Sequence, residues 1–361
     1  MPTPNIPDHG TLYLSTVDCA PATTILRTAT TAGLTIDQTQ DGIATIAITS
    51  SQLRRMCLEW SQALSDADQA DVRCHLSASD ESPSAGTLMH SQSLQRLVRF
   101  VEAEWLDQIL DGNQLVTYFQ PIIVNRSPSE VFAHECLVRG TQASGEIIPP
   151  MKLFGAARAT DRVAQLDHSS RITAIRTCSE RNIGTRIFMN FNPRYLDESH
   201  AYLEDTIRTV LETGMDPEQF VFEVVESDEI QDVGRLMSIV EYCREAGCCV
   251  ALDDMGTGYN SLYLMAAVKP DFIKLDRNLI RDVESDPYKS RVAGKLIELA
   301  RELGIKSVVE GIETEAALEW SVKQGAEYGQ GFLFARPQPE PSKQIHWQGT
   351  PAEPSAPGVR S

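Results

Sequence analysis

The chain has 361 residues, with 50 acidic and 32 basic side chains and a formal net charge of −18. Hydrophobic residues make up 42% of the sequence and charged residues 23%, a balance typical of globular proteins that argues against wholesale disorder. The negative charge argues against a basic groove for duplex nucleic acid or a polybasic membrane anchor. No apolar run reaches the roughly 18 residues of a transmembrane helix, so we expect no membrane insertion.

The beginning of the chain predicts a small α/β module over residues 1–80. Its expected strands are Thr11–Val17, Ile43–Thr49 and Val72–Leu76. Its expected helices are Ala22–Ala32 and Ser51–Leu64. No motif in the module carries chemistry, so a regulatory role is inferred from its position in the chain alone.

A linker is predicted after this module. The stretch Ser77–Gln92 is rich in serine and contains proline and glycine, and we place the linker at 81–93. Apolar residues from Leu94 to Leu110 then follow helical spacing, which predicts a helix that docks on the next domain or, alternatively, one that dimerises or passes a signal. The proline-rich residues 341–361 predict a disordered tail.

We place the next domain at residues 94–340, and residues 112–337 within it alternate between strand-like and helical patterns. The expected strands are Leu115–Val124, Val131–Val138, Arg186–Phe191, Phe220–Val225, Cys249–Leu252, Phe272–Leu275, Ser307–Val309 and Phe332–Phe334. The expected helices between them include Leu203–Thr213, Ile230–Ala246, Ser290–Leu303 and Glu315–Gln324. This alternation predicts an α/β fold, a (β/α)8 TIM-like barrel. Since only Asn125–Glu130 joins the first two strands, too few residues for a parallel crossover, these strands are expected to be antiparallel.

Polar residues recur where the predicted strands end. They are Gln120, Glu135, Asn190, Glu223, Asp253, Asp254, Lys274, Asp276, Glu310 and Gln330. In a barrel these ends lie on one rim, where active sites are built from different strands. Carboxylates gathered there repel one another and need cations, and oxygen ligands with one amide suit Mg²⁺ or Mn²⁺. The adjacent Asp253 and Asp254 could share two such ions.

Longer motifs surround these residues. In chain order they are YFQPI at 118–122, ECLVR at 135–139, MNFN at 189–192, EVVE at 223–226, DDMGTGY at 253–259, FIKLD at 272–276, VEGIET at 309–314 and QGF at 330–332. With these motifs, the chain resembles the EAL-domain cyclic-di-GMP phosphodiesterases over about residues 105–340. The resemblance implies hydrolysis of cyclic-di-GMP to linear pGpG with two divalent metal ions, Mg²⁺ or Mn²⁺.

The resemblance also implies a role for each matching residue. The implied ligands of the first metal ion are Glu135, Asn190, Glu223 and Asp253. Those of the second are Asp253, Asp254 and Glu310. Lys274 matches the lysine beside the attacking water, and Gln330 matches a glutamine that contacts this water or the second metal. The implied substrate contacts are Gln120, Leu137 and Arg139, with Asn192 and Asp276 in support. Glu226 and Glu313 match acids that hold the loop Met255–Ser261.

General chemistry supports the implied reaction. Water held between two divalent ions loses a proton readily and can attack phosphorus in line with the leaving 3′ oxygen. The planar guanidinium of Arg139 can grip a phosphate. Two alternatives remain: a receptor that binds cyclic-di-GMP without hydrolysing it, and an unrelated two-metal barrel hydrolase. Since barrels of the family often pair through surfaces near the loop Met255–Ser261, a homodimer through the barrel is expected.

Some of these residues also have a purely structural interpretation. Lys274 could pair with Asp276, Arg139 could be a surface cation, and Glu223 with Glu226 could be solvated acids. His134 is expected to be a packed histidine rather than a ligand.

Four positions depart from the family pattern. Cys136 replaces a common alanine and is expected to be buried, so activity should survive. The other departures, which touch packing or the loop rather than metal ligands, are Val225, Met255 and Asn260. The eight cysteines form no CxxC pair, so we expect reduced thiols and a cytoplasmic location.

Overall fold

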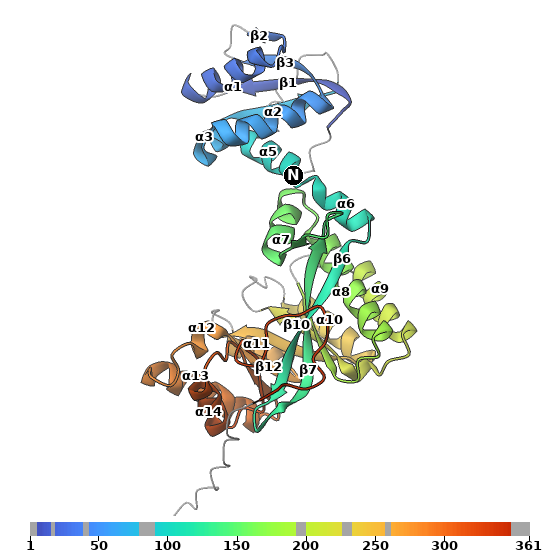
Figure 1. Ribbon diagram of the computed structural model, residues 1–361, viewed down its shortest axis with the longest axis vertical. Coiled ribbons are helices and arrows are strands. Elements are labelled where there is room, and N and C mark those ends of the chain that lie inside the picture. The colour runs from blue at the N-terminus through green and yellow to red at the C-terminus, as the bar shows by residue number, and fades with distance from the viewer. Residues whose placement is uncertain are drawn as a thin grey trace, which may run out of the picture. The chain divides into compact units, whose positions relative to one another are not determined.

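The computed structural model describes residues 6–15, 19–38, 43–78, 91–192, 200–225, 233–256 and 261–347 (Figure 1). It divides into two compact units. The first comprises Met1–Asn113 and Met151–Val163, and the second comprises Gln114–Pro150 and Ala164–Ser361. Among the described helices, none combines the length and the apolar composition needed to cross a bilayer.

The first unit contains a five-stranded antiparallel sheet in the order β2-β3-β1-β4-β5. The strands are β1 (His9–Ser15), β2 (Ile36–Gln38), β3 (Ala44–Thr49), β4 (Arg73–Ser77) and β5 (Gln92–Ser93). The helices are α1 (Cys19–Thr31), α2 (Ser50–Ala63), α3 (Asp66–Asp71), α5 (Leu94–Ala103), α6 (Trp105–Asp111) and α7 (Pro150–Ala159). The order β1-α1-β2-β3-α2-β4 is that of ferredoxin-like folds.

One face of this sheet carries the core of the first unit. Leu12 and Leu14 alternate along β1 and therefore point to the same face, where α1, α2 and α5 pack. Helix α2 begins at a capping box, in which the Thr49 side chain accepts from the backbone N–H of Gln52 while the Gln52 side chain accepts from the backbone N–H of Thr49. Trp60 of α2 is fully buried, and its Nε1 donates to Oγ1 of Thr28 at 2.7 Å.

The first unit extends beyond the linker expected at 81–93. Strand β5 pairs with β4, and α5 places Leu94, Leu97 and Val101 in the core of the first unit. The apolar stripe of this helix therefore covers the sheet of the first unit instead of docking on the barrel. The first of the two segments that form this unit ends at Asn113. Residues 79–90 lie outside the described part of the chain.

The second unit is a closed barrel of eight strands, as the sequence predicted. Its strands are β6 (Leu115–Val124), β7 (Ser127–Thr141), β9 (Arg186–Phe191), β10 (Phe220–Val225), β11 (Cys249–Met255), β12 (Phe272–Leu275), β13 (Lys306–Val309) and β14 (Tyr328–Gly329). A short strand, β8 (Ile147–Ile148), extends β7. Strand β6 is antiparallel to both β7 and β14 and closes the barrel, so the expected antiparallel hairpin is confirmed.

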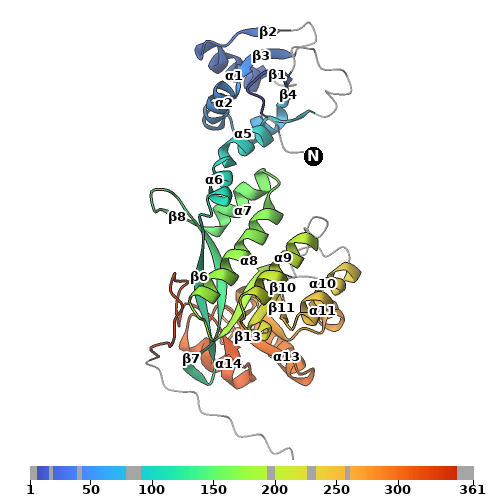
Figure 2. The ribbon, with the colours of Figure 1, turned by 90° about the vertical axis from the view of Figure 1, so that its right-hand side faces the viewer.

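Helices cover the outside of the barrel (Figures 1 and 2). They are α8 (Val163–Glu180), α9 (His200–Glu212), α10 (Val233–Glu245), α11 (Ser261–Val268), α12 (Arg277–Ile280), α13 (Pro287–Glu302) and α14 (Glu315–Gln324), with a 3₁₀ turn, η2 (Pro217–Gln219), before β10. A buried apolar layer from different strands, which includes Phe188, Val221, Ala251 and Val308, fills one level of the barrel. Such layers make a barrel a packed core rather than a pore.

The last barrel strand was predicted at the wrong place. The expected strand Phe332–Phe334 is a turn, and β14 lies earlier, at Tyr328–Gly329. The chain leaves the sheet because the backbone at Gly331 packs directly on Ile312, where an added Cβ would lie 2.0 Å from the Ile312 carbonyl oxygen. Only glycine allows this close approach.

Part of the tail that was expected to be disordered packs on the barrel. Within residues 341–347, the backbone N–H of Ile345 donates to the Ser129 carbonyl at 3.2 Å, and the Ile345 side chain is buried. Trp347 packs against Phe334. Residues 348–361 lie outside the described part of the chain.

The packing of α5 leads to a first prediction. Replacing the fully buried Leu97 with alanine should lower the free energy of unfolding of the first unit by about 2–5 kcal/mol, because it opens a cavity in a closed core. Arg99→Ala, which removes only an exposed ion pair with Asp66, should cost at most about 1 kcal/mol. Hydrogen exchange at the amides of β1 and β3 measures both effects. Equal protection in the two variants would contradict this assignment of α5.

Candidate active site

Four carboxylates surround one buried lysine inside the barrel. Nζ of Lys274 lies 2.7 Å from Oε1 of Glu223 and 2.7 Å from Oε1 of Glu310. It also lies 3.2 Å from Oδ1 of Asp253 and 3.7 Å from Oε2 of Glu135. The lysine side chain is only 1% exposed, so these charges interact with little solvent screening.

Strand geometry brings these side chains together. Glu135 lies on β7, Glu223 on β10, Asp253 on β11 and Lys274 on β12, and Glu310 directly follows β13. The carboxyl ends of parallel barrel strands meet on one rim, so residues far apart in sequence become neighbours. The convergence of the carboxylates predicted for this rim is therefore observed.

A bulge in β11 turns two adjacent aspartates toward the same site. Consecutive residues of a regular strand point to opposite faces. The pairing of β11 with β12 shifts register between Leu252 and Met255, and Asp254 has a left-handed φ of 56°. Such a conformation is uncommon for a residue other than glycine, and aspartate adopts it more readily than most residues. As a result, ligand atoms of Asp253, Asp254 and Glu310 all lie within 4.8 Å of one another.

The chain then turns sharply at Gly256. This residue has a φ of 101°, and a Cβ there would lie 2.9 Å from Cδ2 of Leu279. Glycine is therefore required at this point of the loop Met255–Ser261. Residues 257–260, which include Asn260, lie outside the described part of the chain, and so does Glu226.

Glu223 has the most unusual environment of the four carboxylates. It is fully buried, and neither of its oxygens receives a well-directed hydrogen bond from the described residues, although Nζ of Lys274 lies 2.7 Å from Oε1. A buried carboxylate without directed donors costs free energy unless a cation compensates it. This environment fits a metal ligand better than a solvated acid.

Gln330 binds directly to Glu135. It follows β14, and its Nε2 donates to Oε2 of Glu135 at 2.6 Å across the barrel. Its Oε1 is buried without a hydrogen-bond partner among the described residues. The glutamine thus orients one carboxylate of the site and leaves one acceptor atom available.

Burial raises the pKa of three carboxylates in the site. Desolvation, opposed mainly by Lys274, raises the pKa of Glu223 well above its ordinary value and that of Glu310 to about 8. Desolvation and the neighbouring Asp253 raise the pKa of Asp254 to about 6. Burial alone would lower the pKa of Lys274, but the surrounding carboxylates outweigh it and raise the pKa well above its usual range.

This donor set suits divalent metal ions. Asp253, Asp254 and Glu310 present oxygen atoms close enough to share one ion. Glu135, Glu223 and Asp253 lie around Lys274, and Asn190 lies beside Glu223 in the register of β9 and β10. Carboxylate and amide oxygens are the ligands that Mg²⁺ and Mn²⁺ prefer.

The residues expected to contact substrate lie on the β6–β7 hairpin. Gln120 is paired with Glu135 in register, and its Nε2 donates to the Ala335 carbonyl at 3.3 Å. Leu137 and Arg139 share the face of β7 on which Glu135 lies, because they follow it at steps of two residues. The Arg139 guanidinium lies 5.1 Å from the ring centroid of Tyr118, a partner that the sequence analysis missed.

The remaining predicted residues lie at the edge of the site. Asp276 caps α12 by accepting from the backbone N–H of Asn278 at 2.8 Å, and it is not among the carboxylates paired with Lys274. Asn192 is half-buried just after β9. Glu313 is exposed and contacts no described residue through a hydrogen bond or ion pair, so its expected role at the loop finds no support in the described residues.

Two neighbours of the site were predicted correctly. His134 is a packed histidine, with Nδ1 2.9 Å from Oγ1 of Thr185 and Nε2 3.0 Å from the Ser342 carbonyl. Burial lowers the pKa of His134. Cys136 is buried, with its Sγ 3.8 Å from Sγ of Cys178. The described cysteine side chains form no disulfide.

The position of Lys274 leads to a second prediction. In a chelator, Lys274→Met should lower the free energy of unfolding by about 3–5 kcal/mol, because it leaves buried carboxylates without a cation. Mg²⁺ or Mn²⁺ should restore part of this loss by binding the same carboxylates. Lys323→Met, at an exposed lysine of α14, is the control and should change stability by about 0.5 kcal/mol at most. Urea unfolding measures the loss in Lys274→Met, its recovery with metal ions and the effect of Lys323→Met. An unchanged urea midpoint for Lys274→Met would refute the role of Lys274 in compensating the carboxylates.

The raised pKa values lead to a third prediction, on pH. Glu310 keeps a proton in the folded chain up to about pH 8, whereas an ordinary glutamic acid releases it near pH 4.5. Between these values the folded state binds more protons than the unfolded state, so the free energy of unfolding falls as pH rises. In a chelator, thermal unfolding should therefore occur at lower temperature near the upper end of this range. Glu310→Gln should flatten the dependence, and an unchanged slope in that variant would contradict the assignment.

Comparison with known proteins assigns the chain to a family. The EAL domain family model matches residues 103–337. The chain is 30% identical to the cyclic di-GMP phosphodiesterase PdeR of Escherichia coli, over 67% of this chain and 37% of the relative. It is 31% identical to the cyclic di-GMP phosphodiesterase NbdA of Pseudomonas aeruginosa, over 68% and 32%. The chain thus spans about a third of the length of these curated relatives.

A solved structure gives the same result. The PaMucR phosphodiesterase in complex with c-di-GMP is 30% identical to this chain and superposes with a TM-score of 0.58, over 65% of this chain and 96% of the solved one. The family match, the sequence identities and the closed barrel agree. This chain belongs to the EAL-domain family.

Proposed function

We propose that this chain hydrolyses cyclic-di-GMP to linear pGpG as a two-metal phosphodiesterase. The observation that carries the proposal is the arrangement of Asp253, Asp254 and Glu310, whose ligand atoms lie within 4.8 Å of one another beside the buried Lys274. The relatives named above, which are cyclic di-GMP phosphodiesterases or a c-di-GMP complex, support the substrate.

The metal ligands proposed are those that the sequence analysis expects. Glu135, Asn190, Glu223 and Asp253 would hold one ion, and Asp253, Asp254 and Glu310 the other. When bound, Mg²⁺ or Mn²⁺ would supply a water of lowered pKa and would neutralise charge on the phosphoryl oxygens. The directed contact from Gln330 fixes Oε2 of Glu135, so this ligand has one orientation before substrate arrives.

The chain's own side chains then bind and orient the substrate. Arg139 lies against Tyr118, which holds its guanidinium in place to grip a phosphate. Gln120 lies opposite Glu135 on the neighbouring strand, where its amide can contact the same phosphodiester. Lys274 supplies a fixed positive charge next to the reacting phosphorus, which favours the charge that develops in the transition state.

A second candidate function is a receptor that binds cyclic-di-GMP without hydrolysing it. The specific observation in its favour is that Lys274 already offsets part of the negative charge of the carboxylates, so the barrel depends less on metal ions for charge balance. The complete set of predicted metal ligands favours the enzyme.

Three further features belong to the proposal. Residues 1–80 would regulate the barrel, the barrel would form a homodimer, and the chain would act in the cytoplasm. Light scattering tests the dimer, for which a monomeric mass at working concentration is the contrary result.

The fourth prediction tests the enzyme. Purified chain incubated with cyclic-di-GMP and Mg²⁺ or Mn²⁺ should form pGpG, as separated by chromatography, and a chelator should stop the reaction. Glu135→Ala should lower turnover by about a hundredfold or more, the usual cost of removing a group that positions the reacting centre, while circular dichroism stays unchanged.

The control variant is Glu241→Ala, at an exposed glutamate of α10, which should keep the original turnover. Binding of cyclic-di-GMP without product at either metal ion would replace the enzyme by the receptor. Original turnover in Glu135→Ala would refute the site itself.

A further inference from the structure

Residues 338–347, which we call the C-terminal strap, lie against the β6–β7 hairpin of the barrel. Figure 2 shows this segment in dark red beside the two strands. Its first contact is with β6. The backbone N–H of Phe119 donates to the Gln338 carbonyl at 2.7 Å, and the N–H of Gln338 donates to the Phe119 carbonyl at 3.0 Å. The two residues thus form an antiparallel bridge.

This bridge completes the hydrogen bonding of β6 next to the active site. Strand β14 pairs with β6 over only the last two residues of β6. Because β14 ends at Gly329, the rest of that edge of β6 has no strand partner among the described residues. Gln338 bonds to this edge at Phe119, one residue before Gln120. Since a buried backbone group without a partner costs free energy, the strap stabilises the edge at this point.

The strap then contacts β7. Nε2 of His134 lies 3.0 Å from the Ser342 carbonyl oxygen, which can only accept, so this nitrogen carries the proton and donates it. Further along, the backbone N–H of Ile345 donates to the Ser129 carbonyl at 3.2 Å, and the Ile345 side chain is buried. The strap is therefore bound to both strands of the hairpin.

The beginning of the strap has a restricted backbone. Prolines recur at every second residue, at Pro337, Pro339 and Pro341. Each proline has a fixed φ and restricts the residue before it to extended conformations, so the segment loses little conformational entropy when it binds. Arg181, which directly follows α8, donates to the Pro339 carbonyl at 2.9 Å and pairs with Glu340. The hairpin is thus held by a stiff segment that is itself fixed to the outer helix layer.

The residues that the strap holds lie directly behind two residues of the active site. Consecutive residues of a strand point to opposite faces, so Phe119 and His134 lie outside the barrel when Gln120 and Glu135 face its interior. The rings of Phe119 and His134 meet edge to face, with their centroids 6.1 Å apart. Gln120 and Glu135 are themselves opposite each other in the register of β6 and β7. A displacement of the outer pair would therefore displace the inner pair.

We propose that the C-terminal strap is a positioning element for the active site. By holding Phe119 and His134 from outside, it fixes the positions of Gln120 and Glu135 inside. The inference rests on the proposed function, which makes Glu135 a metal ligand and Gln120 a substrate contact. A ligand that is already in place loses less freedom when the ion binds, so the strap raises the affinity for the ion.

The fifth prediction tests a single backbone hydrogen bond of the strap in the full chain. Gln338→Pro removes the N–H that donates to Phe119, whereas Gln338→Ala removes only an exposed side chain and keeps this N–H. Calorimetric titration should show Mn²⁺ binding about tenfold weaker in Gln338→Pro and unchanged in Gln338→Ala. Hydrolysis of cyclic-di-GMP by Gln338→Pro should require correspondingly more Mn²⁺ and keep its rate at saturating Mn²⁺. Original Mn²⁺ affinity in Gln338→Pro overturns the proposal.

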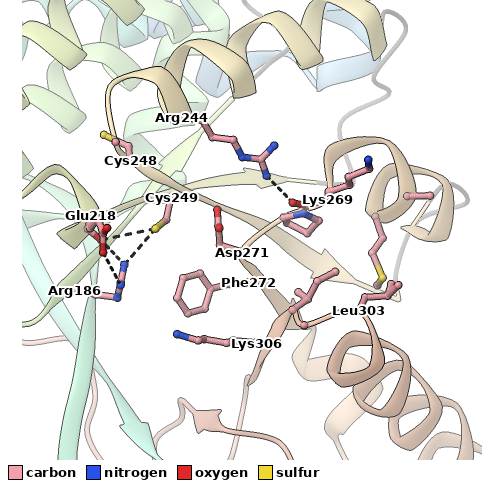
Figure 3. Close-up of a pocket in the computed structure, with 16 residues that line it drawn as sticks. Arg186, Glu218, Arg244, Cys248, Cys249, Lys269, Asp271, Phe272, Leu303 and Lys306 are labelled. Atoms are coloured by element: carbon pink, nitrogen blue, oxygen red, sulfur yellow. Dashed lines mark hydrogen bonds and ion pairs between the residues drawn. The ribbon is translucent and has the colours of Figure 1, made fainter.

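Arg244→Ala is the control for a general loss of stability. Arg244 lines a pocket where the strands β9 to β13 begin, at the opposite end of the barrel from the active site (Figure 3). It donates to the Lys269 carbonyl at 2.6 Å, so Arg244→Ala also removes one hydrogen bond from the barrel. This variant should lower the urea midpoint and keep the original Mn²⁺ affinity. Equally weakened Mn²⁺ binding in Arg244→Ala and Gln338→Pro would show that the strap acts only through stability.

Hydrogen exchange in a chelator tests the strap without metal ions or activity. Gln338→Pro should speed exchange at the amides of β6 and β7 and leave β10 and β11 as they were. Arg181→Ala, which releases the strap at Pro339, should have the same effect and replaces Gln338→Pro if that variant does not fold. Original exchange in β6 and β7 overturns the proposal. A chain that binds no Mn²⁺ contradicts the proposed function instead, and exchange then decides whether the strap holds the hairpin.

Discussion

The charge of Lys274 is the constraint on which the barrel interior depends. A fully buried lysine and a fully buried Glu223 would each cost several kcal/mol if they stood alone. The four carboxylates around Nζ compensate the lysine, and the lysine in turn compensates them only in part, since it carries a single positive charge against their combined negative charge. Burial raises the pKa values of Glu223 and Glu310 against the opposing effect of Lys274, and the neighbouring carboxylates raise these values further. The excess negative charge makes this end of the barrel a candidate site for divalent cations.

The barrel is the fold that makes this arrangement possible. Parallel strands deliver one polar residue each to the same rim, and helices on the outside hold the strands in register. A regular strand could deliver only one of two adjacent aspartates, so the bulge and the left-handed Asp254 are needed for the second. Leu252 and Met255, which flank the two aspartates, are fully buried. Their packing offsets the local backbone strain at Asp254.

Sequence patterns predicted the strands of the barrel well, because buried strands read as short apolar runs that end in a polar residue. The boundaries of β6, β9, β10 and β12 were predicted as the structure has them. The patterns failed where a single close contact with the backbone, rather than the periodic spacing of apolar residues, determines the structure. The tight contact of Gly331 with Ile312 ends β14 early, and nothing in the sequence QGFLF reports that contact. Likewise, the apolar stripe of α5 shows that the helix is half-buried but not which sheet it covers.

In the site, too, the sequence reveals the residue types but not the contacts between them. The residue types at 135, 223, 253, 254, 274 and 310 indicate metal chemistry, but the contacts of Gln330 with Glu135 and of Arg139 with Tyr118 depend on the folded register. These contacts join residues from separate strands, so spacing along the chain cannot reveal them. They decide how each functional group is oriented, which composition alone leaves open.

The path of the chain connects the first unit to this site. The β6–β7 hairpin, which carries Gln120 and Glu135, leaves the first unit at Asn113 and returns to it at Met151. Within the first unit, the returning segment is held by ion pairs of Arg162 with Asp107 at 2.9 Å and of Asp161 with Arg96 at 2.8 Å. Both ends of the hairpin are thus anchored in the module that precedes the barrel. The strand pair that carries Gln120 and Glu135 is therefore a part of the barrel that is joined covalently to the first unit at both of its ends.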